Sequence, residues 1–336
     1  MIWLTWRQFR FPAAVVFGAA VLLALMLFAA GVPAAGDQAL EFLSNKRGDV
    51  QIYTFVTIAM MLAPAVIGMF WGAPLVAREL EAGTHRLVWN QSVTRTRWLL
   101  IKVGLIAVTA MVVAGALGLL LTWWAGPIDD AQIAGQEAQG IVGSSRVGPP
   151  LFISRGIAPI GYFVFAFAVG VLAGTLIRRT VAAMAVTAVV FTLVQLAVPP
   201  LVRAHLDPVV KTITVTPENL GGFMMSGPGG EVVELGVRLA APGAWMISNE
   251  TVDGDGNVTS TFPTWLPDCV RPDVEKMRPI ADPACFKRFA DLGYRQRVTY
   301  QPADRYWTLQ AVETIGFLAL SGGLFGLTLF WVRRRV

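Results

Sequence analysis

Six stretches of this sequence are long and apolar enough to cross a lipid bilayer as helices. Crossing roughly 30 Å of hydrocarbon takes about 20 apolar residues, and a helix satisfies its own backbone hydrogen bonds there. The predicted spans are Phe11–Val32, Thr54–Val76, Leu99–Trp124, Ile157–Ile177, Val181–Val202 and Val312–Val332. Composition agrees, because 55% of the residues are hydrophobic and only 15% are charged. The sequence therefore predicts an all-α polytopic membrane protein with six transmembrane helices.

The predicted orientation follows from the basic residues that flank the spans. On one side of the membrane the flanking segments hold twelve Lys and Arg residues but only two acidic residues. The twelve are Arg7, Arg10, Arg78, Arg86, Arg95, Arg97, Lys102, Arg178, Arg179, Arg333, Arg334 and Arg335. Because short cytoplasmic segments are enriched in Lys and Arg, both chain ends are predicted to lie in the cytoplasm. The basic residues behind the net charge of +5 are thus distributed by side of the membrane and do not indicate a basic patch on one folded surface. We therefore predict no nucleic-acid partner.

The segment 203–311, between the fifth and sixth spans, is long enough to fold as a domain outside the membrane. Several of its pieces carry β-branched and aromatic residues between Gly and Pro, which is typical of strands. The predicted strands are Thr212–Thr216, Val232–Leu239, Trp245–Val252 and Val258–Phe262. We therefore expect a small, partly β extracytoplasmic domain at 203–311, followed by the sixth span and a basic tail at 312–336.

Both cysteines of the chain, Cys269 and Cys285, lie in this outer segment. On the oxidising side of a membrane a disulfide between them is expected, although two unpaired buried thiols are the alternative. The two histidines, His85 and His205, are far apart in sequence. The Cys and His residues therefore do not form a ligand set, and we predict no metal site.

The predicted spans contain almost no ionisable groups, which ion-coupled carriers need at mid-membrane. Glu313 lies at the edge of the last span, and the stem of Lys102 is long enough to reach the cytoplasmic surface. The strongest candidate for a polar substrate contact inside the membrane is Gln195, with Thr187 and Thr192 on the same span. The alternative is that Gln195 forms a hydrogen bond to a neighbouring helix. The chain also has no G-x-x-x-x-G-K-[ST] loop, so a separate ATPase subunit would have to supply energy.

The cytoplasmic loop 77–98 is the segment with the most informative pattern. Gly83-Thr84 can end one helix and begin another, with the Thr84 hydroxyl as the N-cap. Leu80, Leu87 and Val88 recur at helical spacing, which predicts a short amphipathic helix near the membrane surface. Such a helix could insert into a groove on a soluble partner. A solvated loop that only connects two spans is the alternative.

The string Arg78-Glu79-Leu80-Glu81-Ala82-Gly83-Thr84, followed by Ser92-Val93-Thr94-Arg95, resembles the coupling region of type-2 ABC transporter permeases. In that family this segment docks on the ATP-binding subunit. The resemblance implies that the chain binds no cofactor itself and that ATP and magnesium are bound by a separate ABC ATPase. The residues implied to contact this ATPase are Glu79, Glu81, Gly83, Thr84 and Arg86.

The resemblance extends over most of the chain, including 1–10 as an interfacial helix, 11–202 as five spans and the turn at Arg178-Arg179. The outer segment is larger than in minimal drug-export permeases. The resemblance implies a bacterial plasma-membrane location, and a second copy or paralogue that completes the path. It also implies that spans two and five face a central cavity, so candidate lining residues are Phe55, Met60, Met61, Phe191 and Gln195.

The leading hypothesis is therefore the permease subunit of an ATP-driven exporter in contact with membrane lipid. Apolar spans favour a hydrophobic or amphipathic substrate. The alternative is an ATPase-coupled sensor or mechanical transmitter that acts through the outer domain and moves no solute. A membrane enzyme or channel would require clustered polar groups inside the spans, and we expect none.

Overall fold

The computed structural model describes residues 2–31, 47–81, 94–134, 143–226, 231–273 and 278–335. The chain divides into two compact units. A helical unit comprises Met1–Arg203 together with Asp304–Val336, and a second unit comprises Ala204–Ala303. The two units are considered separately below.

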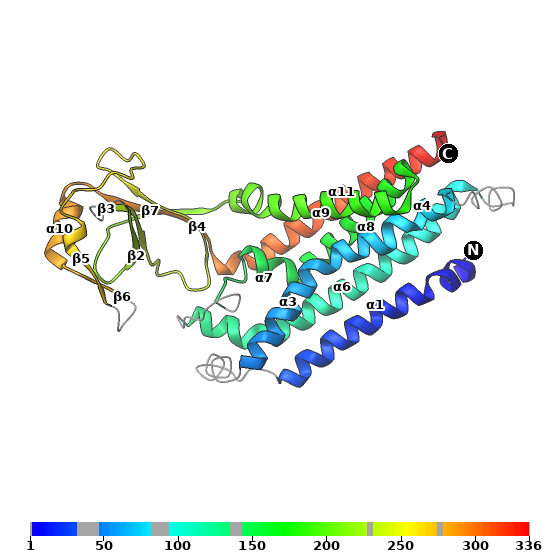
Figure 1. The fold of residues 1–336 in the computed structure, drawn as a ribbon, viewed down its shortest axis with the longest axis horizontal. Helices are drawn as coiled ribbons and strands as arrows, with labels where there is room; N and C mark the ends of the chain where they lie inside the picture. The colour runs from blue at the N-terminus through cyan, green and yellow to red at the C-terminus, as the bar shows by residue number, and fades with distance from the viewer. Residues whose placement is uncertain are drawn as a thin grey trace. The chain divides into compact units, whose positions relative to one another are not determined.

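The helical unit contains six helices that are long and apolar enough to cross a membrane, among the residues that the structure describes. This confirms the predicted number of spans. The elements are α1 (Ile2–Ala30), α3 (Arg47–Ile67), a π-helical turn η1 (Gly68–Gly72), α4 (Ala73–Glu81), α6 (Arg95–Ile133), α7 (Pro149–Ser154), α8 (Ala158–Ile177), α9 (Thr180–Leu201), the 3-10 turns η2 (Arg203–His205) and η4 (Ala303–Arg305), and α11 (Tyr306–Arg335). Figure 1 shows these helices in sequence colours.

Two boundaries differ from those expected. The segment 1–10, predicted as an interfacial helix, is continuous with the first span, because α1 runs without a break over Ile2–Ala30. The third span continues past Trp124 as far as Ile133, and its first turn is capped by Thr94, whose Oγ1 accepts a hydrogen bond from Arg97 N at 3.3 Å. Hydropathy locates the apolar centre of a helix, whereas its ends depend on caps and packing.

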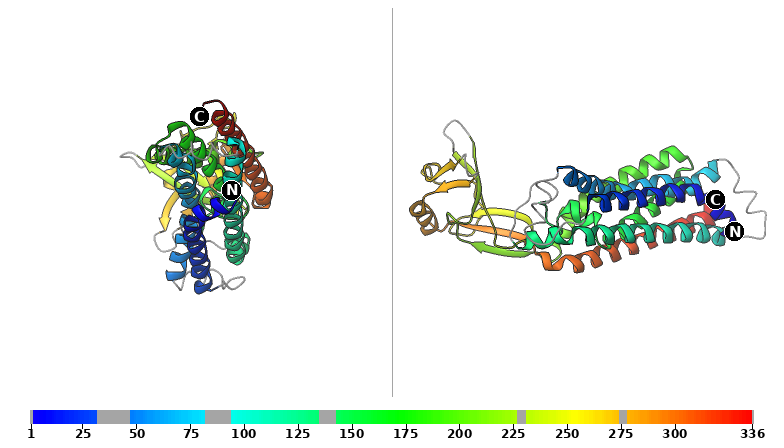
Figure 2. Two further views of the ribbon diagram at one scale, coloured as in Figure 1. Left: turned by 90° about the vertical axis from the view of Figure 1, so that its right-hand side faces the viewer. Right: turned by 90° about the horizontal axis from the view of Figure 1, so that it is seen from below.

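The first helix begins and the last helix ends at the same end of the helical unit, as two views show (Figures 1 and 2). We call this the terminal end and the opposite one the distal end. Helix α4 ends, α6 begins and α8 meets α9 at the terminal end. Helix α9 ends and α11 begins at the distal end.

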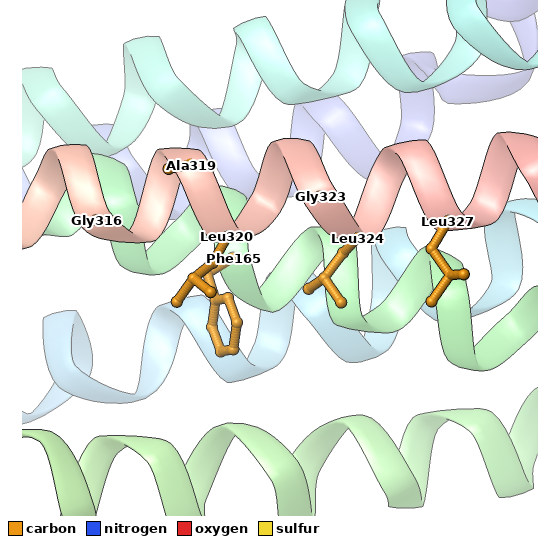
Figure 3. Close-up of a pocket in the computed structure, with 7 residues that line it drawn as sticks. All are labelled: Phe165, Gly316, Ala319, Leu320, Gly323, Leu324 and Leu327. Carbon is orange, nitrogen blue, oxygen red and sulfur yellow. The ribbon is translucent and has the colours of Figure 1, made fainter.

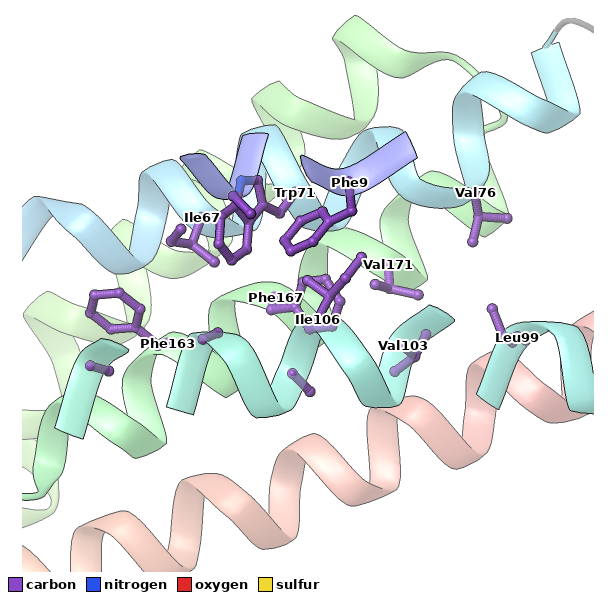
Figure 4. Packing of buried hydrophobic residues seen from close by; sticks show 14 of the residues in the cluster. Phe9, Ile67, Trp71, Val76, Leu99, Val103, Ile106, Phe163, Phe167 and Val171 are labelled. Carbon is purple, nitrogen blue, oxygen red and sulfur yellow. The ribbon is translucent and has the colours of Figure 1, made fainter. Parts of the chain in front are cut away.

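Helix α8 lies at the centre of the helical unit. In its apolar window 78% of residues are buried, against 17% in the windows of α1 and α9. One buried cluster joins Phe9 of α1, Trp71 of η1, Ile106 of α6 and Phe167 of α8 (Figure 4). Such a helix, apolar all round, needs neighbours on every side. The exposed apolar faces of α1, α9 and α11 are suited to lipid or to other transmembrane helices.

Four glycines allow the backbones of η1–α4 and α8 to approach closely. A Cβ atom on Gly68 would lie 2.5 Å from Ala166 O, and one on Gly72 would lie 2.6 Å from Phe167 O. From the opposite helix, a Cβ on Gly170 would overlap Gly68 O, and one on Gly174 would overlap Ala73 O. Small residues four positions apart on both helices are typical of tight packing in membranes. The π-helical turn and α4 are thereby locked against α8.

The second unit is a mixed α/β fold. Its strands are β1 (Val209–Ile213), β2 (Leu220–Ser226), β3 (Glu231–Val237), β4 (Trp245–Val252), β5 (Val270–Asp273), β6 (Arg278–Ala281) and β7 (Arg295–Gln301), with helix α10 (Pro283–Asp291) and the 3-10 turn η3 (Pro267–Cys269). Strands β1, β7 and β4 form an antiparallel sheet, and the pairs β2–β3 and β5–β6 form two more. The core includes Leu235, Phe286, Phe289, Val298 and Tyr300.

Cys269 and Cys285 form a disulfide within this unit, with an S–S distance of 2.08 Å. The expected strand Val258–Phe262 is wrong, since only an isolated bridge joins Val258 to Val252. The turn between them is closed by Asp253, whose N–H donates to Asn257 O at 2.9 Å, and the chain then leaves the sheet. The central strand β7 was not predicted, because its buried side chains include the polar Gln296.

Candidate functional site

The last turn of α4 carries the two acidic residues of the proposed coupling segment, Glu79 and Glu81. Glu79 forms an ion pair with Lys102, about two turns into α6, and the ammonium of Lys102 lies 4.8 Å from the centroid of the Trp98 ring. Lys102 is only 5% exposed. The expectation that Lys102 extends to the cytoplasmic surface is therefore wrong, because a carboxylate within reach on α4 holds its ammonium inside the bundle.

Glu81 joins α4 to the beginning of α9. Its Oε2 accepts hydrogen bonds from the Thr180 hydroxyl at 2.8 Å and from the Thr180 backbone N–H at 3.2 Å. The first N–H groups of a helix have no partner inside the helix, and a carboxylate at that end also interacts favourably with the helix dipole. The contact is exposed, so water competes with it.

The turn from α8 to α9 brings Thr180 to this position. Arg178 ends α8 in the left-handed conformation, with φ of 58°, and its N–H donates to Gly174 O at 3.1 Å. Arg179 is extended, and α9 begins at the next residue. A short basic turn therefore places the start of α9 beside the end of α4.

Helix α4 thus has three connections to the rest of the bundle: Glu79 to α6, Glu81 to α9, and the glycine contacts to α8. A displacement of α4 would reach all three helices. Of the other coupling residues expected from sequence, Gly83, Thr84 and Arg86 lie outside the described residues.

The five candidate lining residues occupy different environments. Phe55 is 55% exposed on α3, whereas Met60 is buried and packs in the core with Tyr53 and Trp124. Phe191 of α9 is also buried, in edge contact with the ring of Tyr162 on α8 at 6.3 Å between centroids.

Gln195 and Met61, both partly buried, are brought together. The Gln195 side-chain amide donates to Met61 O at 3.3 Å, which joins α9 to α3. Among the five candidates, Met60 and Phe191 therefore pack inside this chain, while the Phe55 side chain lies on its surface.

A buried polar cluster at the distal end was not predicted. Arg203, directly after α9, forms a two-bond ion pair with Glu313 of α11: Nε to Oε2 at 3.0 Å and Nη2 to Oε1 at 2.8 Å. The Tyr162 hydroxyl of α8 donates to the same carboxylate. The Arg203 guanidinium lies 3.7 Å from the centroid of the Phe152 ring. All four side chains are buried, so these contacts replace water around both charges.

A second buried ion pair lies in the same unit, where Arg155 Nη1 donates to Asp129 Oδ1 at 2.8 Å. Burial lowers the pKa of Arg155 to about 10, which leaves its guanidinium charged at neutral pH. Both pairs lie at or just beyond the ends of the predicted spans, and neither pairing was predicted from the sequence. The partners lie on different helices, and sequence distance conceals that they meet.

Gln310 of α11 satisfies backbone groups at two helix ends. Its Oε1 accepts from the N–H groups of Ile157 and Ala158 at the start of α8, and its Nε2 donates to Phe152 O and Arg155 O at 2.9 and 3.2 Å. The backbone N–H and C=O groups at the break between α7 and α8 therefore have a side chain as hydrogen-bond partner and need no water. One side chain thus fixes the junction of α7, α8 and α11.

An apolar groove of about 570 Å³ runs along α11 beside α8 (Figure 3). Its lining residues are Phe165, Gly316, Ala319, Leu320, Gly323, Leu324 and Leu327. The groove has no titratable lining residue and offers a packing surface rather than a chemical site. Within the described ranges, no group of three or more His, Cys, Asp or Glu side chains is placed to hold a metal ion.

A comparison with protein families matches residues 13–203 to the model described as ABC-2 membrane transporter related. No curated protein and no solved structure gives a significant match. The matched region covers more than half of the chain and ends at Arg203, so it includes most of the first apolar helix, the next four and both acids of α4. The chain therefore belongs to the ABC-2 membrane transporter related family, as a multi-pass membrane component of an ABC transporter.

Proposed function

We propose that this chain is the permease subunit of an ATP-driven exporter in the bacterial plasma membrane. A separate ABC ATPase, which binds ATP and magnesium, docks at the terminal end on the cytoplasmic side. A second copy or a paralogue of the chain completes the transport path. The observation that carries this proposal is the set of three connections between α4 and helices α6, α8 and α9.

The docking segment of this proposal follows α4 directly. Movement of the segment would pull on Glu81, which binds the first residue of α9, and on Glu79, which binds Lys102 of α6. Because α4 is also locked to α8 through Gly170 and Gly174, it cannot shift alone. Closure of the ATPase would thus be transmitted as a rigid-body shift of packed helices.

The substrate is proposed to be hydrophobic or amphipathic. The exposed residues described on α3 and α9 are mostly apolar, as Phe55 and Leu193 are, with Gln51 and Thr192 as polar exceptions. Such faces can solvate an apolar molecule between two copies of the chain. Within 50–67 of α3 and 180–201 of α9 there is no Asp, Glu, Lys, Arg or His to coordinate a driving ion.

Copurification with a candidate ABC ATPase, beginning with any that a neighbouring gene encodes, tests the docking. Arg86→Glu reverses a charge in the proposed docking segment and is expected to abolish a stable complex. Lys287→Glu, an exposed reversal on α10 in the second unit, is the matched control and should leave the complex intact. If wild type forms no complex, or Arg86→Glu binds as well as wild type, the docking proposal fails.

A mechanical transmitter remains the second candidate, because the chain carries a separately folded, disulfide-bonded unit between Arg203 and Asp304. Proteoliposomes holding the complete complex distinguish the two functions. An exporter moves a fluorescent amphipathic dye in an ATP-dependent way, whereas a transmitter hydrolyses ATP without moving any of a panel of such dyes.

A further inference from the structure

We infer that α9 is a lever, anchored at Arg203, hinged at Pro199-Pro200 and free to swing at its Thr180 end. The proposed function enters only as the source of the driving force. The inference itself rests on the unequal strength of the contacts at the two ends of this helix. Four features of the chain support it.

The anchor is the ion pair of Arg203 with Glu313. Both of its hydrogen bonds are buried, and the Tyr162 hydroxyl adds a third bond to the carboxylate. Separating these groups would leave charges without water or partner inside the bundle, which is far more costly than separating an exposed contact. The end of α9 is therefore held to α8 and α11 throughout.

The hinge lies immediately before the anchor. Pro199 and Pro200 have no N–H, so the carbonyls of Gln195 and Leu196 cannot receive their usual hydrogen bonds within α9. The regular pattern returns at Val202, whose N–H donates to Val198 O at 2.9 Å. Consecutive prolines in a helix are a recognised cause of bending at a defined position.

The shaft of α9 is held lightly. The structure describes the whole of this helix, and only Ala183, Thr187, Phe191 and Pro199 on it are buried. Several of its other apolar side chains are exposed, where lipid can follow a moving surface; they include Val181, Val186, Val189, Leu193 and Leu196. The contact of Gln195 with Met61 O, at 3.3 Å, is at the long end of hydrogen-bond geometry.

The swinging end is Thr180. Its contact with Glu81 is exposed, so water can replace each hydrogen bond as it breaks. Two exposed arginines, Arg178 and Arg179, precede it in a turn of only two residues. The contact that links α9 to the proposed docking segment is thus also the one that opens at least cost.

Distances between spin labels on α6 and α9 test the lever in the full chain in lipid nanodiscs, without any partner. Both native cysteines are in a disulfide, so introduced cysteines would be the only free thiols. Val181→Cys with Leu100→Cys reports the swinging end, and Leu201→Cys with Leu119→Cys reports the anchored end; all four sites are exposed. Dilution with unlabelled chain restricts the signal to pairs within one chain.

A lever gives a broader distance distribution at the Val181 pair than at the Leu201 pair. Glu81→Ala should broaden the first further and leave the second unchanged, while Glu250→Ala, an exposed acid of β4, should alter neither. Replacing both Pro199 and Pro200 with Ala should narrow the first. Equal widths at the two ends, or a broader Leu201 pair, overturn the lever.

The measurement also separates this inference from the proposed function. A broad Val181 pair in a chain that binds no ATPase keeps the lever and removes the exporter. Equal widths in a chain that does bind the ATPase keep the exporter and remove the lever. If the proline variant does not fold, the comparison of the two pairs and the Glu81→Ala variant still decide.

Discussion

Glu81 and Thr180 lie 99 positions apart, yet one carboxylate oxygen of Glu81 accepts hydrogen bonds from both the hydroxyl and the backbone N–H of Thr180. The segment that was expected to face a partner is thus already attached to the transport helices. In this arrangement the two acids of α4 join this helix to α6 and α9.

The buried pair of Arg203 and Glu313 should respond asymmetrically to substitution. Arg203→Met leaves the Glu313 carboxylate buried without its counter-charge, and we expect a loss of roughly 3–5 kcal/mol. Arg203→Met combined with Glu313→Gln removes both charges and should recover most of this loss. Thermal unfolding in detergent micelles measures both. A double variant that is no more stable than the single one would contradict the pairing.

The glycine contacts predict that one added methyl group is harmful in one place and tolerated in another. Gly170→Ala places a Cβ against the backbone of Gly68, where neither helix can yield easily, and should cost about 1–3 kcal/mol. Gly104→Ala on α6 meets nothing within 4 Å and serves as the control. Thermal unfolding of the two variants should differ clearly, and equal stability would argue against the close approach.

Gln310 is expected to matter far more than Gln195, although both are glutamines on apolar helices. Gln310→Leu keeps the shape but leaves buried N–H and C=O groups at the α7–α8 junction unpaired, at about 1–3 kcal/mol for each such group. Gln195→Leu removes one long hydrogen bond and should be close to neutral. Unfolding midpoints in detergent provide the comparison, and similar losses in both variants would refute this role of Gln310.

The six helices could be predicted because hydropathy is a property of consecutive residues. The spacing of Gly68 with Gly72, and of Gly170 with Gly174, was also visible in the sequence. What was not visible is that these two pairs face each other, since pairing depends on how α8 packs. The π-helical turn that aligns Gly68 and Gly72 leaves no signal in composition.

The polar contacts were missed for the same physical reason. Arg203 directly follows the predicted end of the fifth span, and Glu313 lies at the edge of the sixth, so each alone resembles a residue at the membrane surface. The two residues lie 110 positions apart in sequence, and only the fold shows that Arg203 Nη2 and Glu313 Oε1 are 2.8 Å apart. Lys102 was likewise interpreted without Glu79, its partner on another helix.

In the proposed function, α4 passes the motion of an ATPase to the helices through Glu81. The most direct test is the Val181–Leu100 spin-label distance in the complex with the ATPase subunit, with and without a non-hydrolysable ATP analogue. We expect nucleotide to shift this distance in the wild-type chain, and Glu81→Ala to abolish the shift while the complex remains intact. A full nucleotide-dependent shift in the Glu81→Ala complex would contradict this role of Glu81.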